Sequence, residues 1–206
     1  MKLAVFDFDS TLMDGETLEF LANNVGIRQR VKDITDRAMN GELDFFESLQ
    51  ERVFLLKGLK VETVNEICGQ LPMMNGADVI VNKLQSAGYK VVCFSGGFKN
   101  ATVPFVKKLG LDAEFSNTFH SKHGVLTGFV GGEMMFNNSK GVMLQKLQNI
   151  LGISAKDTLV VGDGANDLSM FEYAALRVAF CAKPVLKEKA NVIIEEKDLS
   201  LILDKI

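Results

Sequence analysis

The stretch that decides the fold stands at the start of the chain and reads Lys2-Leu3-Ala4-Val5-Phe6-Asp7-Phe8-Asp9-Ser10-Thr11-Leu12. An apolar run ends there in two carboxylates, Asp7 and Asp9, and two hydroxyls follow. The run predicts a buried strand whose carboxyl end carries the carboxylates into a loop. In open α/β sheets, that edge is where ligands bind. Taken alone, the pattern also fits an Asp-rich turn that caps a helix.

A second apolar run ends in the same way, at Thr158-Leu159-Val160-Val161-Gly162-Asp163-Gly164-Ala165-Asn166-Asp167. A capping turn does not explain this repetition, whereas two strand ends can converge at one edge of a parallel sheet. Clustered carboxylates repel each other unless a cation or a shared proton stabilises them. Carboxylate oxygens with room for water suit Mg²⁺. The chain has only two histidines and no CxxC pair, so a Cys/His metal site is poorly supported.

Composition limits the class of protein. The 206 residues suffice for one substantial core and a modest insertion. Apolar residues make up 47% and charged residues 24% of the chain, which is ordinary for a soluble globular protein. The net charge of −3 and the lack of a long basic run argue against a nucleic-acid or anionic-membrane partner. No apolar stretch approaches the roughly 18 residues of a membrane span, and we expect no signal peptide.

Cysteine usage indicates the compartment. Cys68, Cys93 and Cys181 are an odd number, and two of them lie in apolar, strand-like runs. This predicts reduced, mostly buried thiols in a cytoplasmic protein. We expect a monomer or a homodimer that acts on a small molecule, with no nucleic acid or membrane as partner.

The spacing of apolar residues predicts a helical insertion after the first strand, followed by alternating elements. The first expected helices, with breaks near Gly26, Gly41 and Gly58, span 16–24, 28–40, 45–56 and 61–70. Further helices are expected at 76–87, 140–151, 166–175 and 184–190, and one more should follow Ser95-Gly96-Gly97 and end near residue 109. Strands are expected at 89–94, 113–119, 178–181 and 192–194, and one more should begin at residue 158. The turn Lys122-His123-Gly124-Val125 predicts a β-hairpin within residues 120–130.

This order predicts an α/β protein with a Rossmann-like parallel sheet flanked by helices and right-handed crossovers. Four helices cannot pack inside such a sheet. We therefore expect residues 15–71 to form a small helical cap over the carboxyl edge, above Asp7 and Asp9. Residues 1–14 and 72–206 would form the catalytic core.

Four loops would bring chemically active groups to that edge, namely Asp7 and Asp9, Ser95-Gly96-Gly97, Lys140, and Asp163 with Asn166 and Asp167. This set suits phosphoryl transfer, because a metal and a lysine offset the repulsion between a phosphate and an attacking anion. Glycines let backbone N–H groups approach phosphate closely. Singly, each group has a simpler explanation, such as a plain turn at residue 95 or a surface lysine at 140. The joint pattern carries the prediction.

These residues resemble the haloacid dehalogenase-like superfamily of phosphohydrolases, and within it the phosphoserine phosphatase branch. The resemblance covers almost the whole chain and is carried by Asp7-Phe8-Asp9-Ser10-Thr11, Ser95-Gly96-Gly97-Phe98, Lys140, Gly162-Asp163-Gly164-Ala165-Asn166-Asp167 and Ala179-Phe180-Cys181-Ala182-Lys183-Pro184. It implies that Asp7 is the nucleophile and Asp9 the general acid/base.

The resemblance also implies the remaining roles. Asp7, Asp163 and the backbone carbonyl of Asp9 would hold Mg²⁺, with Asp167 in support. The phosphoryl group would be bound by Ser95, Gly96, Lys140 and Asn166, with Lys140 also catalytic. The amino-acid part of the substrate would be read from the cap by Glu16, Met39, Phe45 and Arg52. Glu16 would attract an ammonium group and Arg52 would bind a carboxylate.

Simpler explanations of the cap residues stay open at this point. Arg52 lies near other charges and could belong to a solvated helix face. Either Phe45 or Phe46 could face the site, and we favour Phe45. Glu16 could merely favour the start of a helix.

The implied activity is hydrolysis of O-phospho-L-serine to L-serine and phosphate through an aspartyl-phosphate, a step of L-serine biosynthesis. One alternative is transfer of the phosphoryl group to another alcohol such as homoserine. Another is hydrolysis of a different small phosphate monoester. A catalytically dead binding module is disfavoured because Asp7, Asp9, Lys140 and Asp163 are all present.

Overall fold

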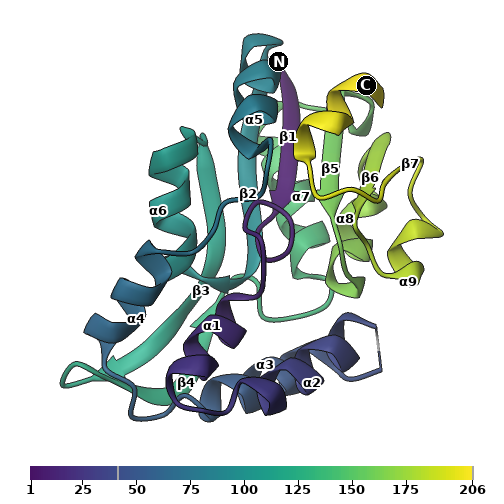
Figure 1. The fold of residues 1–206 in the computed structure, drawn as a ribbon. Coiled ribbons are helices and arrows are strands. Elements are labelled where there is room, and N and C mark those ends of the chain that lie inside the picture. Colours follow the sequence, from purple (N-terminus) through teal and green to yellow (C-terminus); the bar gives the residue numbers. More distant parts are fainter. Residues whose placement is uncertain (41, 206) are drawn as a thin grey trace.

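The computed structural model describes residues 1–40 and 42–205, but not the side chain of Met39. Within these residues, one sheet has the strand order β4-β3-β2-β1-β5-β6-β7 (Figure 1). Its strands are β1 (Lys2–Asp7), β2 (Tyr89–Phe98), β3 (Ala113–Lys122), β4 (Val125–Gly132), β5 (Thr158–Gly162), β6 (Leu176–Phe180) and β7 (Val192–Ile194). Neighbouring strands are parallel except β3 and β4, which form an antiparallel hairpin. The α/β fold and the hairpin are confirmed.

The alternation of side chains along β1 explains why both faces of the sheet are covered. Ala4 and Phe6 belong to a core cluster with α5 (Ala77–Ser86), α6 (Lys99–Leu109) and a 3₁₀ helix, η3 (Leu199–Lys205). Leu3 and Val5 point to the other face, with α7 (Ser139–Leu151), α8 (Leu168–Phe171) and α9 (Pro184–Lys187). The sheet is therefore the middle of three layers, as its apolar sequence predicts.

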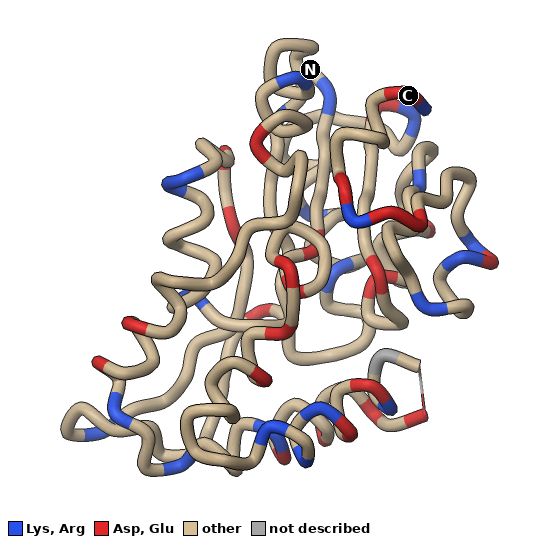
Figure 2. Tube along the Cα trace, viewed as in Figure 1, with Lys and Arg blue, Asp and Glu red and all other residues tan. Residues whose placement is uncertain are grey.

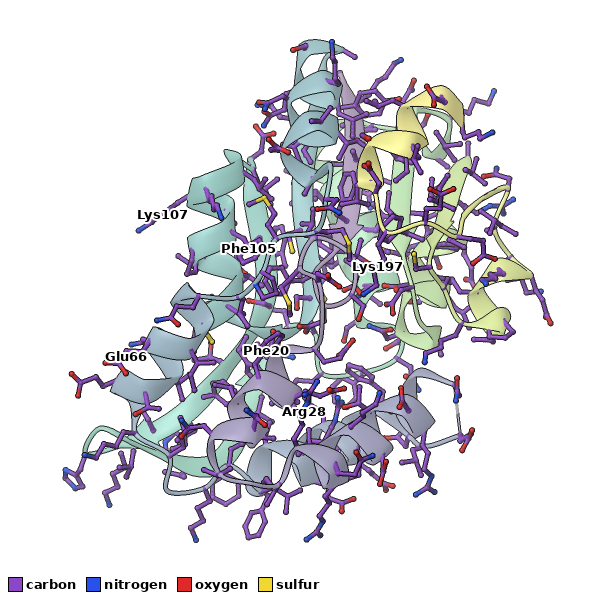
Figure 3. The ribbon with its side chains drawn as sticks, viewed as in Figure 1. Phe20, Arg28, Glu66, Phe105, Lys107 and Lys197 are labelled. Atoms are coloured by element: carbon purple, nitrogen blue, oxygen red, sulfur yellow. The ribbon has the colours of Figure 1, made fainter. Side chains whose placement is uncertain are left out.

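The two sides of α6 show how a helix covers this sheet (Figure 3). Phe105 is buried and meets the ring of Phe8 edge-on, with 4.9 Å between ring centroids. Lys107, two positions further along, is exposed and points away from the sheet. Residues two apart lie on opposite sides of a helix, so one side can be apolar and the other charged.

The insertion after β1 is helical, as predicted. It contains α1 (Thr17–Asn24), α2 (Arg28–Met39), α3 (Phe45–Phe54) and α4 (Val61–Gly69). The chain termini lie at one end of the molecule and α1–α3 at the other, below the carboxyl ends of the strands (Figure 1). The side chain of Asp44 caps α3 by accepting the N–H of Glu47 at 3.0 Å. The division into a core and a 15–71 cap stays a prediction, and the expected break at Gly41 lies outside the described residues.

Some expected bounds are wrong. The strand expected at 89–94 continues to Phe98, but its register against β3 shifts between Phe94 and Phe98. Ser95-Gly96-Gly97 is therefore a bulge within β2 and not a loop after it. The helix expected at 166–175 is a 3₁₀ turn, η2 (Ala165–Asp167), followed by the short α8. The sequence analysis did not predict η3.

Charges of both signs are interspersed along the chain (Figure 2). Helix α2, for example, carries Lys, Arg and Asp residues in close succession. Among the residues described, no helix combines the length and apolar character needed to cross a membrane.

Candidate active site

Three aspartates meet because β1 and β5 are neighbours in the sheet. Asp7 ends β1, and Asp163 directly follows β5. The η2 turn then brings Asp167 back toward the strand ends. One carboxylate oxygen of each of these three buried residues lies within 4.8 Å of the others. The sheet thus brings together the two strand ends that the sequence singled out.

Lys140 places a buried positive charge between two of these carboxylates. It lies in the first turn of α7, where the sequence predicted a helix start. Its Nζ lies 2.5 Å from Oδ1 of Asp7 and 2.5 Å from Oδ1 of Asp167. Burial lowers the pKa of Lys140, but attraction by Asp167 and Asp7 outweighs this and the net shift is upward. The lysine therefore stays charged in the interior.

Both oxygens of Asp167 are occupied by the protein itself. Oδ1 accepts from Lys140, and Oδ2 accepts the backbone N–H groups of Asp163 and Gly164 at 3.0 and 3.1 Å. A Cβ at residue 162 would collide with the Asp167 carboxylate, so glycine is required there. Because the protein itself occupies both oxygens, Asp167 is less free than Asp7 to bind a metal directly, and its supporting role stays a prediction.

The donor set fits a divalent cation. Burial raises the pKa of Asp7 to about 7, with a further contribution from Asp167, although Lys140 lowers it. Burial and the charge of Asp7 raise the pKa of Asp163 well above its ordinary value. Desolvated carboxylates resist ionisation unless a positive charge is close. Hard oxygen donors packed this closely are what Mg²⁺, Mn²⁺ or Ca²⁺ prefer.

Asp9 has one oxygen fixed and the other directed toward the bulge of β2. Its Oδ1 accepts the backbone N–H of Thr17 at 2.7 Å and the Thr17 hydroxyl at 2.5 Å. Its Oδ2 faces Gly97, where a Cβ would come within 2.9 Å of it. Burial raises the pKa of Asp9, and the two bonds from Thr17 lower it. The sequence analysis missed Thr17, although a hydroxyl residue directly after Glu16 could have indicated it.

The bulge brings Ser95, Gly96 and Gly97 to the same place. The Gly97 N–H donates to Oγ of the buried Ser95 at 2.9 Å. A Cβ on Gly96 would overlap the Phe45 ring, so this glycine permits close contact with α3. Asn166 lines a narrow cavity beside this bulge, and its buried Oδ1 has no hydrogen-bond partner among the described residues. Because this oxygen is an acceptor, its lack of a partner suggests that a hydrogen-bond donor or a cation completes the site.

The insertion supplies the opposite wall. Asp7, Asp9, Glu16, Leu18, Phe45, Leu49, Arg52, Gly96, Gly97, Asp163 and Asn166 line one narrow cavity of about 30 Å³. Arg52 is only 3% exposed, so the solvated-helix explanation is wrong. Its Nη1 donates to the Thr35 hydroxyl at 3.0 Å and its Nε to the Ser48 carbonyl at 3.1 Å. Both bonds aim the guanidinium at the cavity.

The structure also decides between the alternatives that the sequence left open for Glu16 and for the neighbouring Phe45 and Phe46. Glu16 does not cap α1 with its side chain, because Oε1 accepts the Ser10 hydroxyl at 2.7 Å. Burial and the charge of Asp9 raise the pKa of Glu16 to about 8. Phe45 lines the cavity, whereas Phe46 stacks on Phe136. The side chain of Met39 lies outside the described residues.

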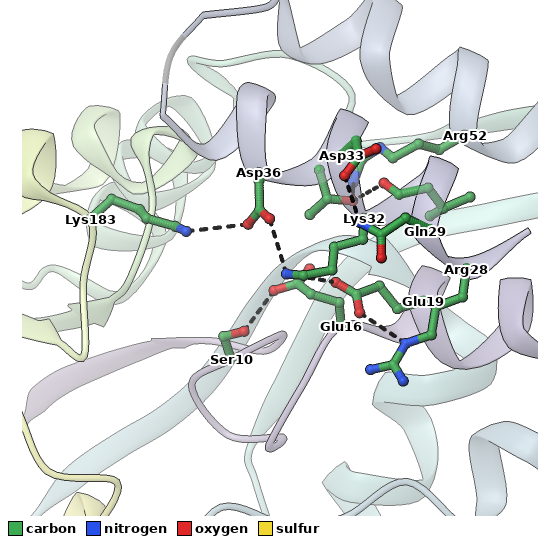
Figure 4. A network of polar contacts seen from close by, with 12 residues as sticks. Ser10, Glu16, Glu19, Arg28, Gln29, Lys32, Asp33, Asp36, Arg52 and Lys183 are labelled. Atoms are coloured by element: carbon green, nitrogen blue, oxygen red, sulfur yellow. Dashed lines mark hydrogen bonds and ion pairs between the residues drawn. The ribbon is translucent and has the colours of Figure 1, made fainter.

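A wider cleft of about 510 Å³ adjoins the narrow cavity and shares Glu16 and Asp163 with it. A polar network spans this cleft (Figure 4). Lys183, just before α9, reaches across to Asp36 of α2 at 3.3 Å, and Lys32 bonds the same carboxylate at 3.0 Å. An ion pair thus joins α2 of the insertion to the segment between β6 and α9, at the mouth of the site, and the sequence analysis did not anticipate it.

Buried carboxylates, a buried lysine and a glycine bulge at the carboxyl edge of a parallel sheet define a class of phosphoryl-transfer enzymes. The chain belongs to the haloacid dehalogenase-like hydrolases, whose family model matches residues 1–175. Members of this family are generally metal-dependent, which agrees with the carboxylate cluster.

Individual relatives are more specific. The chain is 61% identical to the phosphoserine phosphatase of Wolinella succinogenes over 98% of both chains. It is 48% identical to that of Methanocaldococcus jannaschii, over 98% of this chain and 96% of the relative. Two solved structures each match it with a TM-score of 0.97, at 48% and 47% identity, covering 100% of this chain and 98% of theirs. They are a phospho-aspartyl intermediate analogue of phosphoserine phosphatase and a substrate-bound phosphoserine phosphatase complex.

Proposed function

We propose that this chain hydrolyses O-phospho-L-serine to L-serine and inorganic phosphate, as a step of L-serine biosynthesis. The observation that carries the proposal is the placement of Glu16 and Arg52 on the wall that faces Asp7. An amino acid presents an ammonium and a carboxylate, and one cavity here offers Glu16 for the ammonium and Arg52 for the carboxylate. Burial raises the pKa of Glu16 to about 8, and the ammonium of a bound substrate would favour its ionised form. The family and the full-length relatives named phosphoserine phosphatase support the same substrate.

Asp7 acts as the nucleophile. One of its carboxylate oxygens attacks phosphorus, and the bond between phosphorus and the serine oxygen breaks. Asp9 gives a proton to the departing alkoxide through its free oxygen, Oδ2, while Thr17 holds Oδ1. Asp9 then removes a proton from a water molecule, which attacks the aspartyl-phosphate and releases phosphate and Asp7.

The neighbouring residues bind and orient the phosphoryl group. Lys140 keeps a fixed positive charge beside Asp7. Gly96 and Asn166 line the cavity, and the buried Ser95 precedes Gly96 in the bulge of β2, so these three residues can offer hydrogen-bond donors at the same edge. Asp7, Asp163 and the backbone carbonyl of Asp9 would hold Mg²⁺, which supplies positive charge against the phosphate oxygens when it is bound. Asp167 orients Lys140 and the turn after β5.

We further propose that residues 15–71 act as a cap that encloses the substrate. Phe45, and by prediction Met39, would exclude water from the phosphoryl group when the substrate is bound. The wider cleft beside Glu16 offers the entry route, because the narrow cavity alone has room for only a few water molecules. The cytoplasmic location and the monomeric or homodimeric state stay predictions.

The test is release of inorganic phosphate from a panel of monoesters with Mg²⁺. The panel comprises L-phosphoserine, phosphothreonine, phosphoethanolamine, glycerol phosphate and p-nitrophenyl phosphate, with EDTA as a control. We expect a strong preference for L-phosphoserine. Turnover of p-nitrophenyl phosphate without that preference would contradict the substrate and retain the chemistry. Formation of phosphohomoserine after homoserine is added would instead support a phosphotransferase.

A further inference from the structure

Asn117 is a buried amide on β3 whose side chain contacts the bulge of β2. It has no exposed surface. Its Nδ2 donates to the Gly96 carbonyl at 3.0 Å and to the Met134 carbonyl at 3.1 Å, and its Oδ1 accepts the Met134 N–H at 2.9 Å. Three backbone groups from two other segments are thus bound by one amide, which uses both its donors and its acceptor.

The bulge explains why an amide is needed at this position. The ladder pairs Phe94 with Phe115 and resumes only where Phe98 meets Asn117, so the residues from 95 to 97 lie outside it. A backbone carbonyl left out of a ladder costs free energy unless another donor reaches it. Nδ2 of Asn117 is that donor for Gly96. A Cβ on Gly132, the ladder partner of Asn117, would collide with this side chain, so glycine leaves room for it.

The peptide between Gly96 and Gly97 is consequently held at both of its polar ends. Its carbonyl accepts from Asn117, and its N–H donates to Oγ of Ser95 at 2.9 Å. Because a peptide group is planar, fixing the direction of the carbonyl also fixes that of the N–H. Oγ of Ser95 is thereby used as an acceptor. Within residues 1–40 and 42–205, Oγ of Ser95 makes no second hydrogen bond. A Cβ on Gly97, which lines the cavity, would come within 3.0 Å of this Oγ and 2.9 Å of Oδ2 of Asp9, so the hydroxyl lies beside the free oxygen of Asp9 and can donate to a ligand there.

We propose that Asn117 is a positioning residue for phosphoryl binding. By orienting the Gly96-Gly97 peptide, it makes the Ser95 hydroxyl a hydrogen-bond donor to a phosphate oxygen. The inference rests on the proposed function and extends it to a residue outside the cavity lining. The bonds to Met134 add a second link, because that residue precedes α7, whose first turn carries Lys140. One amide therefore ties together the segments that bring two phosphate-binding groups.

A double-mutant cycle on the Kd of inorganic phosphate, measured calorimetrically with Mg²⁺ present, tests this inference. The proteins are wild type, Asn117→Asp, Ser95→Ala and the double variant. Asn117→Asp keeps the size of the side chain but turns an oxygen toward two carbonyls. We expect each single change to weaken phosphate binding by about 10-fold or more. The double variant should bind within about 2-fold of Ser95→Ala, because Asn117 acts through that hydroxyl.

Additive losses in the cycle would overturn the proposal. If the substitution weakened binding without acting through Ser95, for example through its new negative charge or a less rigid site, the same loss of phosphate affinity would be measured in the Ser95→Ala background. Asn117→Ala carries no charge and should give the same non-additivity, so it replaces the aspartate variant if that one fails to fold.

Gln148→Glu is the matched control. Gln148 is also a buried amide, donating to the Thr158 hydroxyl at 2.9 Å and to the Tyr173 carbonyl at 2.8 Å, near the amino end of β5. The same amide-to-carboxylate change there should lower Tm and leave the phosphate Kd unchanged. A wild type that neither binds phosphate nor hydrolyses phosphoserine would contradict the proposed function. An active wild type with unchanged phosphate binding in Asn117→Asp would contradict this inference alone.

Discussion

The ammonium of Lys140 lies 2.5 Å from Oδ1 of Asp7, although the two residues are separated by 133 positions in the chain. Both side chains are almost fully buried, and Asp167 lies at the same distance from the ammonium on its other side. A buried charge is tolerated only when partners of opposite sign satisfy it. This relationship therefore decides both the charge state of the site and part of its stability.

Replacing Lys140 should lower the free energy of unfolding. Lys140→Met leaves Asp7 and Asp167 without their cation, and breaking a buried pair costs about 3–5 kcal/mol. Protonation can neutralise the stranded carboxyls, so the loss in free energy of unfolding should be smaller near pH 5 than near pH 8. Urea unfolding in EDTA at both pH values measures this. Lys146→Met, at an exposed lysine on the same helix, should change stability by less than about 0.5 kcal/mol.

Removing the nucleophile should separate chemistry from folding. Asp7→Asn keeps the shape of the side chain but cannot form an aspartyl-phosphate, so turnover should fall by about 10⁴-fold or more. The variant should remain folded, because it removes one charge from a cluster of repelling carboxylates. Phosphate release and circular dichroism measure the two effects, with Asp157→Asn as an exposed control. Substantial activity in Asp7→Asn would rule out the proposed mechanism.

Metal binding should oppose the fall in stability with rising pH. The folded protein without metal raises the pKa of Asp7 from 3.8 to about 7 and that of Glu16 from 4.5 to about 8. The folded state then holds more protons than the unfolded state, so stability falls as pH rises from about 4 to 8. Mg²⁺ favours the ionised carboxylates and should release protons on binding. The rise in Tm on adding Mg²⁺ should therefore be larger near pH 8 than near pH 6. Equal rises at both would contradict this assignment.

Substrate recognition should depend on the planar guanidinium of Arg52. Arg52→Lys keeps the charge but loses the planar pair of donors that matches a carboxylate. KM for L-phosphoserine should rise by about 10-fold or more, whereas turnover of phosphoethanolamine, which has no carboxylate, should change little. Steady-state kinetics with both substrates measure the difference. Arg30→Lys, at an exposed position, is the matched control and should alter neither substrate. A similar loss for both substrates would place Arg52 outside carboxylate recognition.

Much of the site was predictable because its groups follow local patterns. The apolar runs before Asp7 and Asp163 mark two strand ends, and parallel strands present those ends at one edge. The helix start at Lys140 and the glycines after Phe94 could likewise be read from a few neighbouring residues. These features depend on hydrogen-bonding and burial periods that act over a single element.

Other features could not be read from one element. The burial of Arg52 and the choice of Phe45 over Phe46 depend on how α3 packs against the sheet. The Thr17 bonds to Asp9 and the Lys183 pair with Asp36 join segments whose contact no local pattern encodes.

The sequence by itself therefore determined the chemistry of this protein: which strand ends carry carboxylates, which helix carries a lysine in its first turn, and which segment after the first strand is helical. Only the tertiary structure decided that β1 and β5 are neighbours, that Arg52 is buried, and that Asn117 binds the Gly96 carbonyl. Local patterns reflect interactions between residues close in the chain. The pairing of distant residues depends instead on the packing of whole elements, where small free-energy differences summed over many contacts select one arrangement.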